Sequence, residues 1–215
     1  MFPVALVLDG EILSVFSGPM PFVGPDGVQH SVTVWTSWTD KDWEEKCPGV
    51  QRLPVIDNVP TSAAATARCL PTTQWKVTDT AVETVYETFE KSLDTVKTEH
   101  KNLASSQRYV AETGGITVGG AVIRTDRESQ GLVNGAYSLA RDMVDGHVPA
   151  QPIDFKGASG WEQIAPEDMV AIGRAVALHV QACFSRERAL HRQIDDAGDI
   201  EAVLAINVTA GWPSA

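Results

Sequence analysis

Cysteine is scarce in this sequence. Only three occur in 215 residues, Cys47, Cys69 and Cys183. An odd number of widely spaced cysteines is not typical of a disulfide framework, which needs pairs in a small secreted domain. The cysteines therefore predict reduced thiols in a protein that is made in the cytoplasm.

Long apolar runs are also missing. No segment approaches the roughly 18 apolar residues that a membrane span needs. The apolar segment from Phe2 to Leu8 is short, contains Pro3 and is followed by Asp9. We therefore expect it not to be a secretory signal.

Basic residues are few relative to acidic ones. The chain has 17 Lys and Arg against 28 Asp and Glu, a formal net charge of −11. Binding to nucleic acid without sequence preference needs Lys and Arg to displace counterions, and the same sign disfavours anionic membranes. We expect neither nucleic acid nor a membrane among the partners.

Motifs that support catalysis are not found. The sequence has no G-x-S-x-G elbow and no glycine-rich phosphate loop followed by Lys-Ser/Thr. Gly114-Gly115 and Gly119-Gly120 lack that lysine and fit a helix end and a turn. Asp195, Asp196 and Asp199 miss the spacing of a calcium loop, and helix capping accounts for them. We expect no enzymatic activity and no cofactor.

One pair of residues has the spacing of metal ligands. His179 and Cys183 stand four residues apart on an expected helix and could share a metal. A structural zinc site usually needs four ligands, and no CxxC motif accompanies this pair. We therefore predict no metal, and interpret the two residues as a buried thiol and a partly buried imidazole.

The first part of the chain is rich in signals for strands. Val4–Leu8 and Glu11–Phe16 flank Asp9-Gly10, a strong signal for a hairpin. Residues 28–38 are rich in β-branched and aromatic side chains and should include another strand. Residues 39–46 predict a short capped helix.

We expect the rest of the chain to be organised around the segment from Ser92 to Leu139. Ser92 is suited to cap a helix of about 20 residues, which Gly114 should end in a left-handed conformation. Apolar and polar residues alternate at spacings of three and four along it. The members of this seam are Leu93, Val96, His100, Leu103, Gln107 and Val110.

The seam has two interpretations. His100 and Gln107 could fix the register of a self-associating coiled coil, because polar core residues specify partner and alignment there. Alternatively, the helix packs against its own domain and these two side chains reach solvent at the edge. With little more than three heptads, the sequence favours neither.

Two hairpins and two further helices are expected after this helix. Gly119-Gly120 should turn a hairpin between residues 116–118 and 121–123. Residues 125–128 read as a capping box, with Thr125 as the cap. The apolar face of the helix that follows comprises Leu132, Ala136, Leu139, Ala140 and Met143.

The second hairpin should join residues 153–156 to 161–164 through residues 157–160. Pro166 suits the first position of a long helix ending near Ile194. Its apolar face comprises Ile172, Val176, His179, Val180, Cys183, Leu190 and Ile194. Asp199 should cap a short helix that reaches Ile206, and Trp212 should dock on the helices.

These elements predict an α+β fold with three parts. Residues 1–60 form a β-rich docking domain made of hairpins. Residues 61–91 form a linker, placed near 57–65, and a hairpin that pairs Trp75–Val77 with Val82–Tyr86. Residues 92–215 begin with the long central helix and form a C-terminal domain in the order helix, hairpin, helix, hairpin, helix.

The C-terminal part is similar to a known family. The sequence blocks that carry this resemblance are residues 113–120, 124–130, 154–156, 160–161, 179–184, 186–187 and 211–213. In this order they resemble a C-terminal domain of unknown function found in many tailed-bacteriophage tail and tail-fibre proteins. The resemblance covers roughly Leu93 to Pro213. It implies a role in the virion or its assembly near the tail tip, and it implies no catalytic residue.

Two functions are therefore expected, with a third as an outsider. The first is a structural component of a phage tail, an adaptor at the baseplate or fibre base that contacts other tail proteins, with self-association through the seam. The second is a tail-fibre assembly chaperone that the finished particle does not retain. The outsider is a hydrolase that acts on the host envelope.

Overall fold

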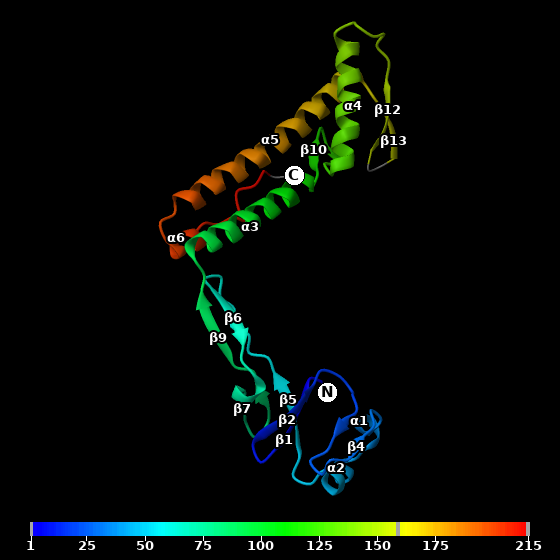
Figure 1. Cartoon of the computed structure of the whole chain (residues 1–215). Helices are drawn as coiled ribbons and strands as arrows, with labels where there is room; N and C mark the ends of the chain where they lie inside the picture. Colours follow the sequence, from blue (N-terminus) through cyan, green and yellow to red (C-terminus); the bar gives the residue numbers. More distant parts are fainter. Residues whose placement is uncertain (1, 158–159, 214–215) are drawn as a thin grey trace. The chain divides into compact units, whose positions relative to one another are not determined.

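A computed structural model describes residues 2–157 and 160–213 of the chain (Figure 1). It divides the chain into two compact units, Met1–Lys91 and Ser92–Ala215. Strands prevail in the first unit and helices in the second, which confirms the α+β class. The turn predicted at Ala158-Ser159 lies outside the described residues.

A five-stranded sheet is the framework of the first unit. Its strands follow the order β2-β1-β5-β8-β7. Their bounds are Val4–Leu8 (β1), Glu11–Phe16 (β2), Gln51–Ile56 (β5), Lys76–Val77 (β7) and Val82–Glu83 (β8). Asp9 and Gly10 both have positive φ, at 52° and 81°, so the expected two-residue hairpin turn is confirmed.

Strand β1 is buried on both faces of this sheet. Leu6 packs on one side with Phe16, Phe22 and Trp43. On the other side Ala5 and Val7 pack with Leu53 and Val82. A continuous apolar run is what a strand covered on both faces needs, and Val4–Leu8 supplies one.

An aromatic cluster covers one face of the sheet. It is built on β3 (Phe22–Val23), β4 (Gln29–His30), α1 (Val34–Ser37) and α2 (Asp40–Lys46). The strand expected in residues 28–38 is only the two-residue β4, and residues 34–37 are helical. The helical turn lets Val34 and Trp35 both pack on the same aromatic side chains, which an alternating strand would prevent.

Residues 57–64, in the predicted linker, contain no helix or strand. The segment that follows has strand pairing that was not predicted, because β6 (Ala65–Cys69) pairs with β9 (Tyr86–Glu90) in a two-stranded ribbon. β7 and β8 pair as predicted, with the 3₁₀ turn η1 (Thr72–Gln74) before them. Tyr86 opens β9 instead of extending the hairpin: Thr84 bonds to the Ile56 carbonyl and to Asp57, and Tyr86 pairs with Cys69 of β6.

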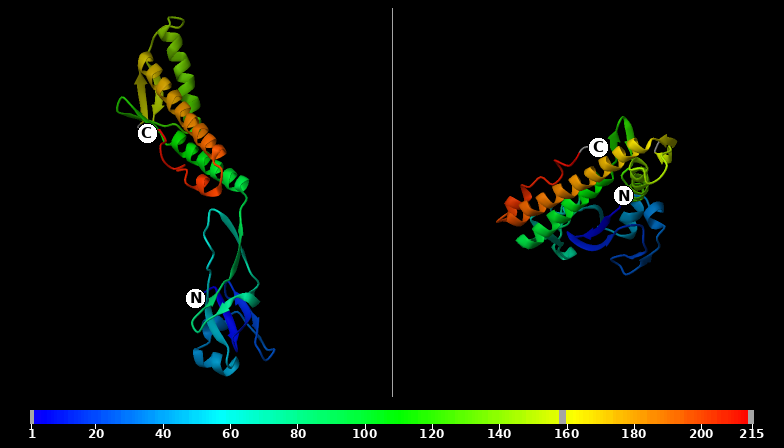
Figure 2. Two further views of the ribbon diagram at one scale, coloured as in Figure 1. Left: turned by 90° about the vertical axis from the view of Figure 1, so that its left-hand side faces the viewer. Right: turned by 90° about the horizontal axis from the view of Figure 1, so that it is seen from above.

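The second unit has the predicted order of elements (Figure 2). Its helices are α3 (Leu93–Thr113), α4 (Arg127–Val144), α5 (Pro166–Asp196) and α6 (Ile200–Leu204). Its hairpins are β10–β11 (Ile116–Val118 and Ala121–Ile123) and β12–β13 (Ile153–Gly157 and Gly160–Ile164). Pro166 opens α5, and Asp199 caps α6, as expected, although α6 ends at Leu204.

Helix α5 connects two hydrophobic cores. With 31 residues it is about 46 Å long. Its first half packs with α4 and both hairpins, where Met169, Val170 and Val176 are buried. Its second half packs with α3, α6 and the C-terminal segment, where Leu190 and Ile194 are buried. The expected docking of Trp212 on this second core is confirmed.

Two local predictions about α3 and α4 are wrong. Gly114 follows the last helical residue of α3, as expected, but keeps a right-handed conformation with φ −73°, and Gly115 takes the positive φ of 91°. The cap of α4 is Asp126, whose side chain accepts from the Ser129 N–H, in place of Thr125. Thr125 is fully buried, and its hydroxyl oxygen accepts a hydrogen bond from the Gly115 N–H instead of capping the helix.

The apolar face of α4 is also rotated from its expected position. Val133, Ala140 and Met143 are buried, whereas Leu132 and Leu139 are 59% and 42% exposed. Two leucines of this helix therefore face outward.

Candidate functional site

A buried carboxylate holds the helix ends around the first hairpin of the second unit. Glu112, in the last turn of α3, is fully buried and pairs with Arg108 one turn earlier. It also lies 3.4 Å from Arg127 and accepts a 3.2 Å hydrogen bond from Gln130, both on α4. The carboxylate therefore joins the end of α3 to the start of α4.

Gln130 and Thr125 extend this junction to the backbone. The Gln130 amide donates to the Thr125 carbonyl at 2.7 Å. The Thr125 hydroxyl accepts the Gly115 N–H at 2.9 Å. These bonds close both ends of the segment that contains β10–β11, so the hairpin projects from a rigid base.

Arg108 carries the network to α5. Its guanidinium stacks on the Phe184 ring at 4.8 Å. Its Nε lies 3.2 Å from the Glu187 carboxylate, close enough for an ion pair but outside hydrogen-bond alignment. The carboxylates of Glu112 and Glu187 are both largely buried, so each needs the Arg108 guanidinium as a nearby positive charge.

The crossing of α4 and α5 sets the other side of the site. Gly173 faces Tyr137, and a Cβ at this position would lie 2.5–2.7 Å from the tyrosine side chain. Only glycine allows the two helices to approach this closely. The first turns of α4 and α5 thereby come to line a common space.

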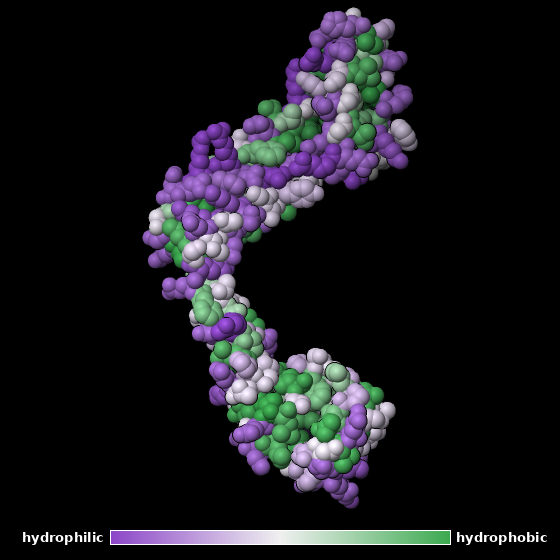
Figure 3. Space-filling view, viewed as in Figure 1, coloured by the Kyte–Doolittle hydropathy of each residue, from purple (hydrophilic) through white to green (hydrophobic). Residues whose placement is uncertain are grey.

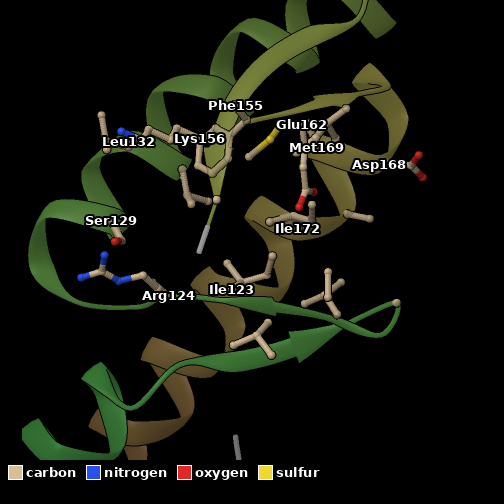
Figure 4. A pocket seen from close by; sticks show the side chains of 18 of the residues that line it. Ile123, Arg124, Ser129, Leu132, Phe155, Lys156, Glu162, Asp168, Met169 and Ile172 are labelled. Atoms are coloured by element: carbon tan, nitrogen blue, oxygen red, sulfur yellow. The ribbon is translucent and has the colours of Figure 1, made fainter. Parts of the chain in front are cut away.

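That space is a pocket of about 570 Å³ between the two hairpins and the starts of α4 and α5 (Figure 4). Its apolar lining includes Ile123 from β11, Leu132 from α4, Phe155 from β12, and Met169 and Ile172 from α5. Figure 4 shows Ile123, Phe155 and Ile172 around the open centre, with the Met169 sulfur beside Phe155. This volume lies within the range of ligand sites, roughly 300–1,000 Å³.

Charged side chains surround the apolar centre. Arg124 and Asp126 form an ion pair at 3.1 Å. Hydrogen bonds from the backbone and side chain of Ser129 lower the pKa of Asp126, which is thus held as an anion. Lys156 lies 5.8 Å from the centre of the Trp161 ring. Asp168 points away from the centre in Figure 4.

The lining supports binding better than bond-making. The Ser129 hydroxyl donates to Asp126 at 2.7 Å in its capping role. No histidine or cysteine occurs among the described residues that line the pocket. A serine nucleophile needs an adjacent base, and Asp126 is committed to the helix end and to Arg124.

The residues of the predicted seam are split between two environments. Leu93 and Val96 pack in the second core, and His100 Nε2 lies 2.8 Å from the Ile206 carbonyl oxygen. Leu103 and Val110 are 43% and 64% exposed. The C-terminal segment of the same chain thus covers the first half of the seam. Gln107 is half-buried between the two environments.

The predicted pair of His179 and Cys183 is buried at the α3–α5 interface. His179 Nε2 lies 3.0 Å from the Ala111 carbonyl oxygen and 3.8 Å from the Cys183 sulfur. Nε2 must carry a proton to donate to the carbonyl, so it cannot also bind a metal. Burial raises the pKa of the Cys183 thiol, which favours its neutral form.

Cys47 has similar surroundings in the first unit. Its sulfur lies 3.8 Å from His30 Nε2, but the side chain is 1% exposed and burial raises the pKa of its thiol. Such a thiol is a poor nucleophile. In the described part of the chain, no three His, Cys, Asp or Glu side chains gather as a metal site would require.

Sequence reasoning missed the pocket. None of the six seam residues lines it. A signal was present, since three of the sequence blocks named above supply part of its lining. The block 113–120 supplies Val118 and Gly119, the block 124–130 supplies Arg124, Asp126, Glu128 and Ser129, and the block 154–156 supplies Phe155 and Lys156.

The second unit is thus a small α+β domain with a pocket between two hairpins. A family model described as a domain of unknown function, DUF4376, matches residues 95–209, which is more than half of the 215-residue chain. The chain therefore belongs to this family. No curated protein and no solved structure shows significant similarity to it.

None of the helices within residues 2–157 and 160–213 has the length and apolar character to cross a membrane.

Proposed function

We propose that the protein is a structural component of a bacteriophage tail, an adaptor at the baseplate or fibre base that acts through protein–protein contacts. The observation that carries the proposal is the pocket of the second unit, which offers apolar side chains on a rigid base. The resemblance of residues 93–213 to a domain of tail and tail-fibre proteins supplies the setting. In this proposal the protein is made in the host cytoplasm and resides in the virion.

The first unit adds a second surface of the same kind. Large apolar side chains are exposed on it, including Met20 at 53% and Val23 at 63%. Figure 3 shows a broad group of hydrophobic residues on the visible face of this unit. Large exposed apolar patches commonly mark sites of protein–protein contact. The first unit is therefore suited to dock on a neighbouring tail protein.

Self-association is part of the proposal. Leu103 and Val110 remain exposed on α3, one heptad apart. Changing Leu103→Asp should leave a folded protein and reduce its mass in sedimentation to that of a monomer. If the wild-type protein already sediments as a monomer, the proposal of self-association is refuted, and the proposed adaptor role is unaffected.

The alternative is a tail-fibre assembly chaperone. The outward-facing Leu132 at the pocket rim favours it, since a chaperone must hold a partner's apolar surface reversibly. Mass spectrometry of purified particles separates the two functions. We expect the protein in particles at a fixed stoichiometry. Its absence from particles, together with its binding to a fibre protein in infected cells, would favour the chaperone.

A further inference from the structure

We infer that the pocket of the second unit docks an extended, basic segment of a partner protein that inserts one large apolar side chain. This inference rests on the proposed function, because it names the kind of segment that an adaptor would hold.

The lining selects an apolar anchor. Ile123, Phe155, Ile164 and Ile172 are half-buried around the space, and Met169 beneath them is fully buried. An aliphatic or aromatic side chain inserted among them would remove apolar surface from water on both partners. About 570 Å³ leaves room for a side chain and part of its backbone.

The two hairpins favour an extended backbone. Within residues 2–157 and 160–213, β11 pairs only with β10 and β12 only with β13. Both strands border the pocket, and each has an outer edge whose N–H and C=O groups have no strand partner. An extended peptide can add to such an edge, with alternate side chains entering the pocket.

The charges select a basic segment. Two cationic side chains, Arg124 and Lys156, line the pocket. Four anionic ones do so as well, namely Asp126, Glu128, Glu162 and Asp168. The residues that line the pocket therefore carry a net charge of −2, to which Asp168 contributes although its side chain points away from the centre (Figure 4). Potentials of opposite sign are favoured across an interface, and like charges are penalised.

The same charges argue against other occupants. A second copy would bring a chain of net charge −11 to an acidic mouth. An anionic lipid or nucleotide would meet the same repulsion. A Lys- or Arg-containing segment with a central apolar residue satisfies both the lining and the charge.

The test uses the full chain and three short blocked peptides in calorimetry. The first has one phenylalanine between lysines, the second the same phenylalanine between glutamates, and the third alanine between lysines. We expect the first to bind at least tenfold more tightly than either of the others. We also expect its affinity to fall as salt is added.

Two variants on one helix locate the binding. Ile172→Arg places a cation in the pocket lining and should weaken the first peptide at least tenfold. Leu178→Arg makes the same kind of change at a residue that is 70% exposed on α5 and does not line the pocket. We expect Leu178→Arg to leave the affinity unchanged.

A double substitution on the surface tests the same inference if Ile172→Arg does not fold. Glu128 and Asp168 are exposed, so Glu128→Lys combined with Asp168→Lys should fold. These changes take the lining charge from −2 to +2 and should reverse the preference toward the glutamate peptide. Equal binding of the lysine and glutamate peptides, or no change in either variant, would overturn the inference.

The outcome is independent of the particle analysis. If the protein is found in particles but the lysine peptide does not bind, the inference fails and the adaptor proposal stands. If the peptide binds in the pocket but the protein belongs to no particle or fibre complex, the tail role fails.

Discussion

Single side chains at helix ends carry much of the local stability. Asp42 lies at the third position of α2, where it accepts from the Thr39 N–H at 2.8 Å, and Thr39 accepts in return from the Asp42 N–H at 3.2 Å. Hydrogen bonds from the Thr39 side chain and backbone, and one from Lys46, lower the pKa of Asp42 to about 2. Thus the sequence motif Thr-x-x-Asp acts as a capping box, with Asp in the place of Glu or Gln.

The lowered pKa of Asp42 predicts a pH dependence. Since the folded value lies below that of the unfolded chain, near 3.9, the bonds stabilise the fold above about pH 4. This contribution should be lost as the pH falls toward 2. Fluorescence of the neighbouring Trp43 during acid titration measures it. Asp42→Asn cannot titrate, so it should be less stable at neutral pH and flatter below pH 4. An unchanged acid profile would refute the assignment.

Glu112 joins the end of α3 to the start of α4 beside the pocket. Its side chain is 1% exposed, and the Arg108 side chain is 14% exposed. Glu112→Ala should cost about 3 kcal/mol, because it leaves Arg108 with Glu187 alone and Gln130 with one partner fewer. Urea unfolding followed by helix ellipticity measures the loss. Glu167→Ala removes an exposed acid from the first turn of α5 and should cost less than about 1 kcal/mol. Equal losses in both variants would contradict this role.

Among the elements, the crossing of α4 and α5 decides whether the pocket exists. Gly173→Ala must displace Tyr137, and overpacking of this kind should cost about 1–3 kcal/mol. Gly135→Ala, on α4, makes the same change where no atom lies within 4 Å of the new Cβ. It should stabilise the protein by about 0.5–1 kcal/mol, because alanine favours the helix. The two free energies of unfolding should therefore change in opposite directions, and a shared sign would refute the close approach.

Elements with local signals were predictable from the sequence. The hairpins at Asp9-Gly10 and Gly119-Gly120 were predictable because these residues accept positive φ. The start of α5 at Pro166 was predictable because the first position of a helix does not need the N–H that proline lacks. The face of α4 was not predictable in the same way. Leu132 and Leu139 satisfy the helical period as well as Val133 does, and only the position of α5 decides which of them is buried.

The pocket could not be predicted from local sequence patterns, because its formation also depends on how distant elements pack. It combines residues from 118 to 172 that no single periodicity relates. The cap at Asp126 was also hidden, because Thr125 and Asp126 are both good capping residues. The choice between them depends on the tertiary bond from the Gly115 N–H to Thr125.

At the scale of the whole molecule, each unit contains complete cores. The two clusters of the first unit use described residues between 2 and 82, and the two clusters of the second use residues between 93 and 212. Domains that each have a core can fold separately. The proposed adaptor role would gain from this arrangement, because one unit could bind a neighbour without a change in the stability of the other.

Separate folding is testable with a fragment that begins at Ser92. This cut keeps the Ser92 cap, which accepts the Thr95 N–H at 3.2 Å, and all the residues of both cores of the second unit. We expect residues 92–215 to unfold cooperatively in urea, with the midpoint that helix ellipticity reports for the full chain. The fragment contains Trp161 and Trp212, so subtracting its fluorescence from that of the full chain leaves the signal of Trp35, Trp38, Trp43 and Trp75 in the first unit. The transition of this difference signal should differ from the helix transition. A fragment without cooperative unfolding would show that the helices depend on the first unit, and the proposed adaptor would then have to work as one body.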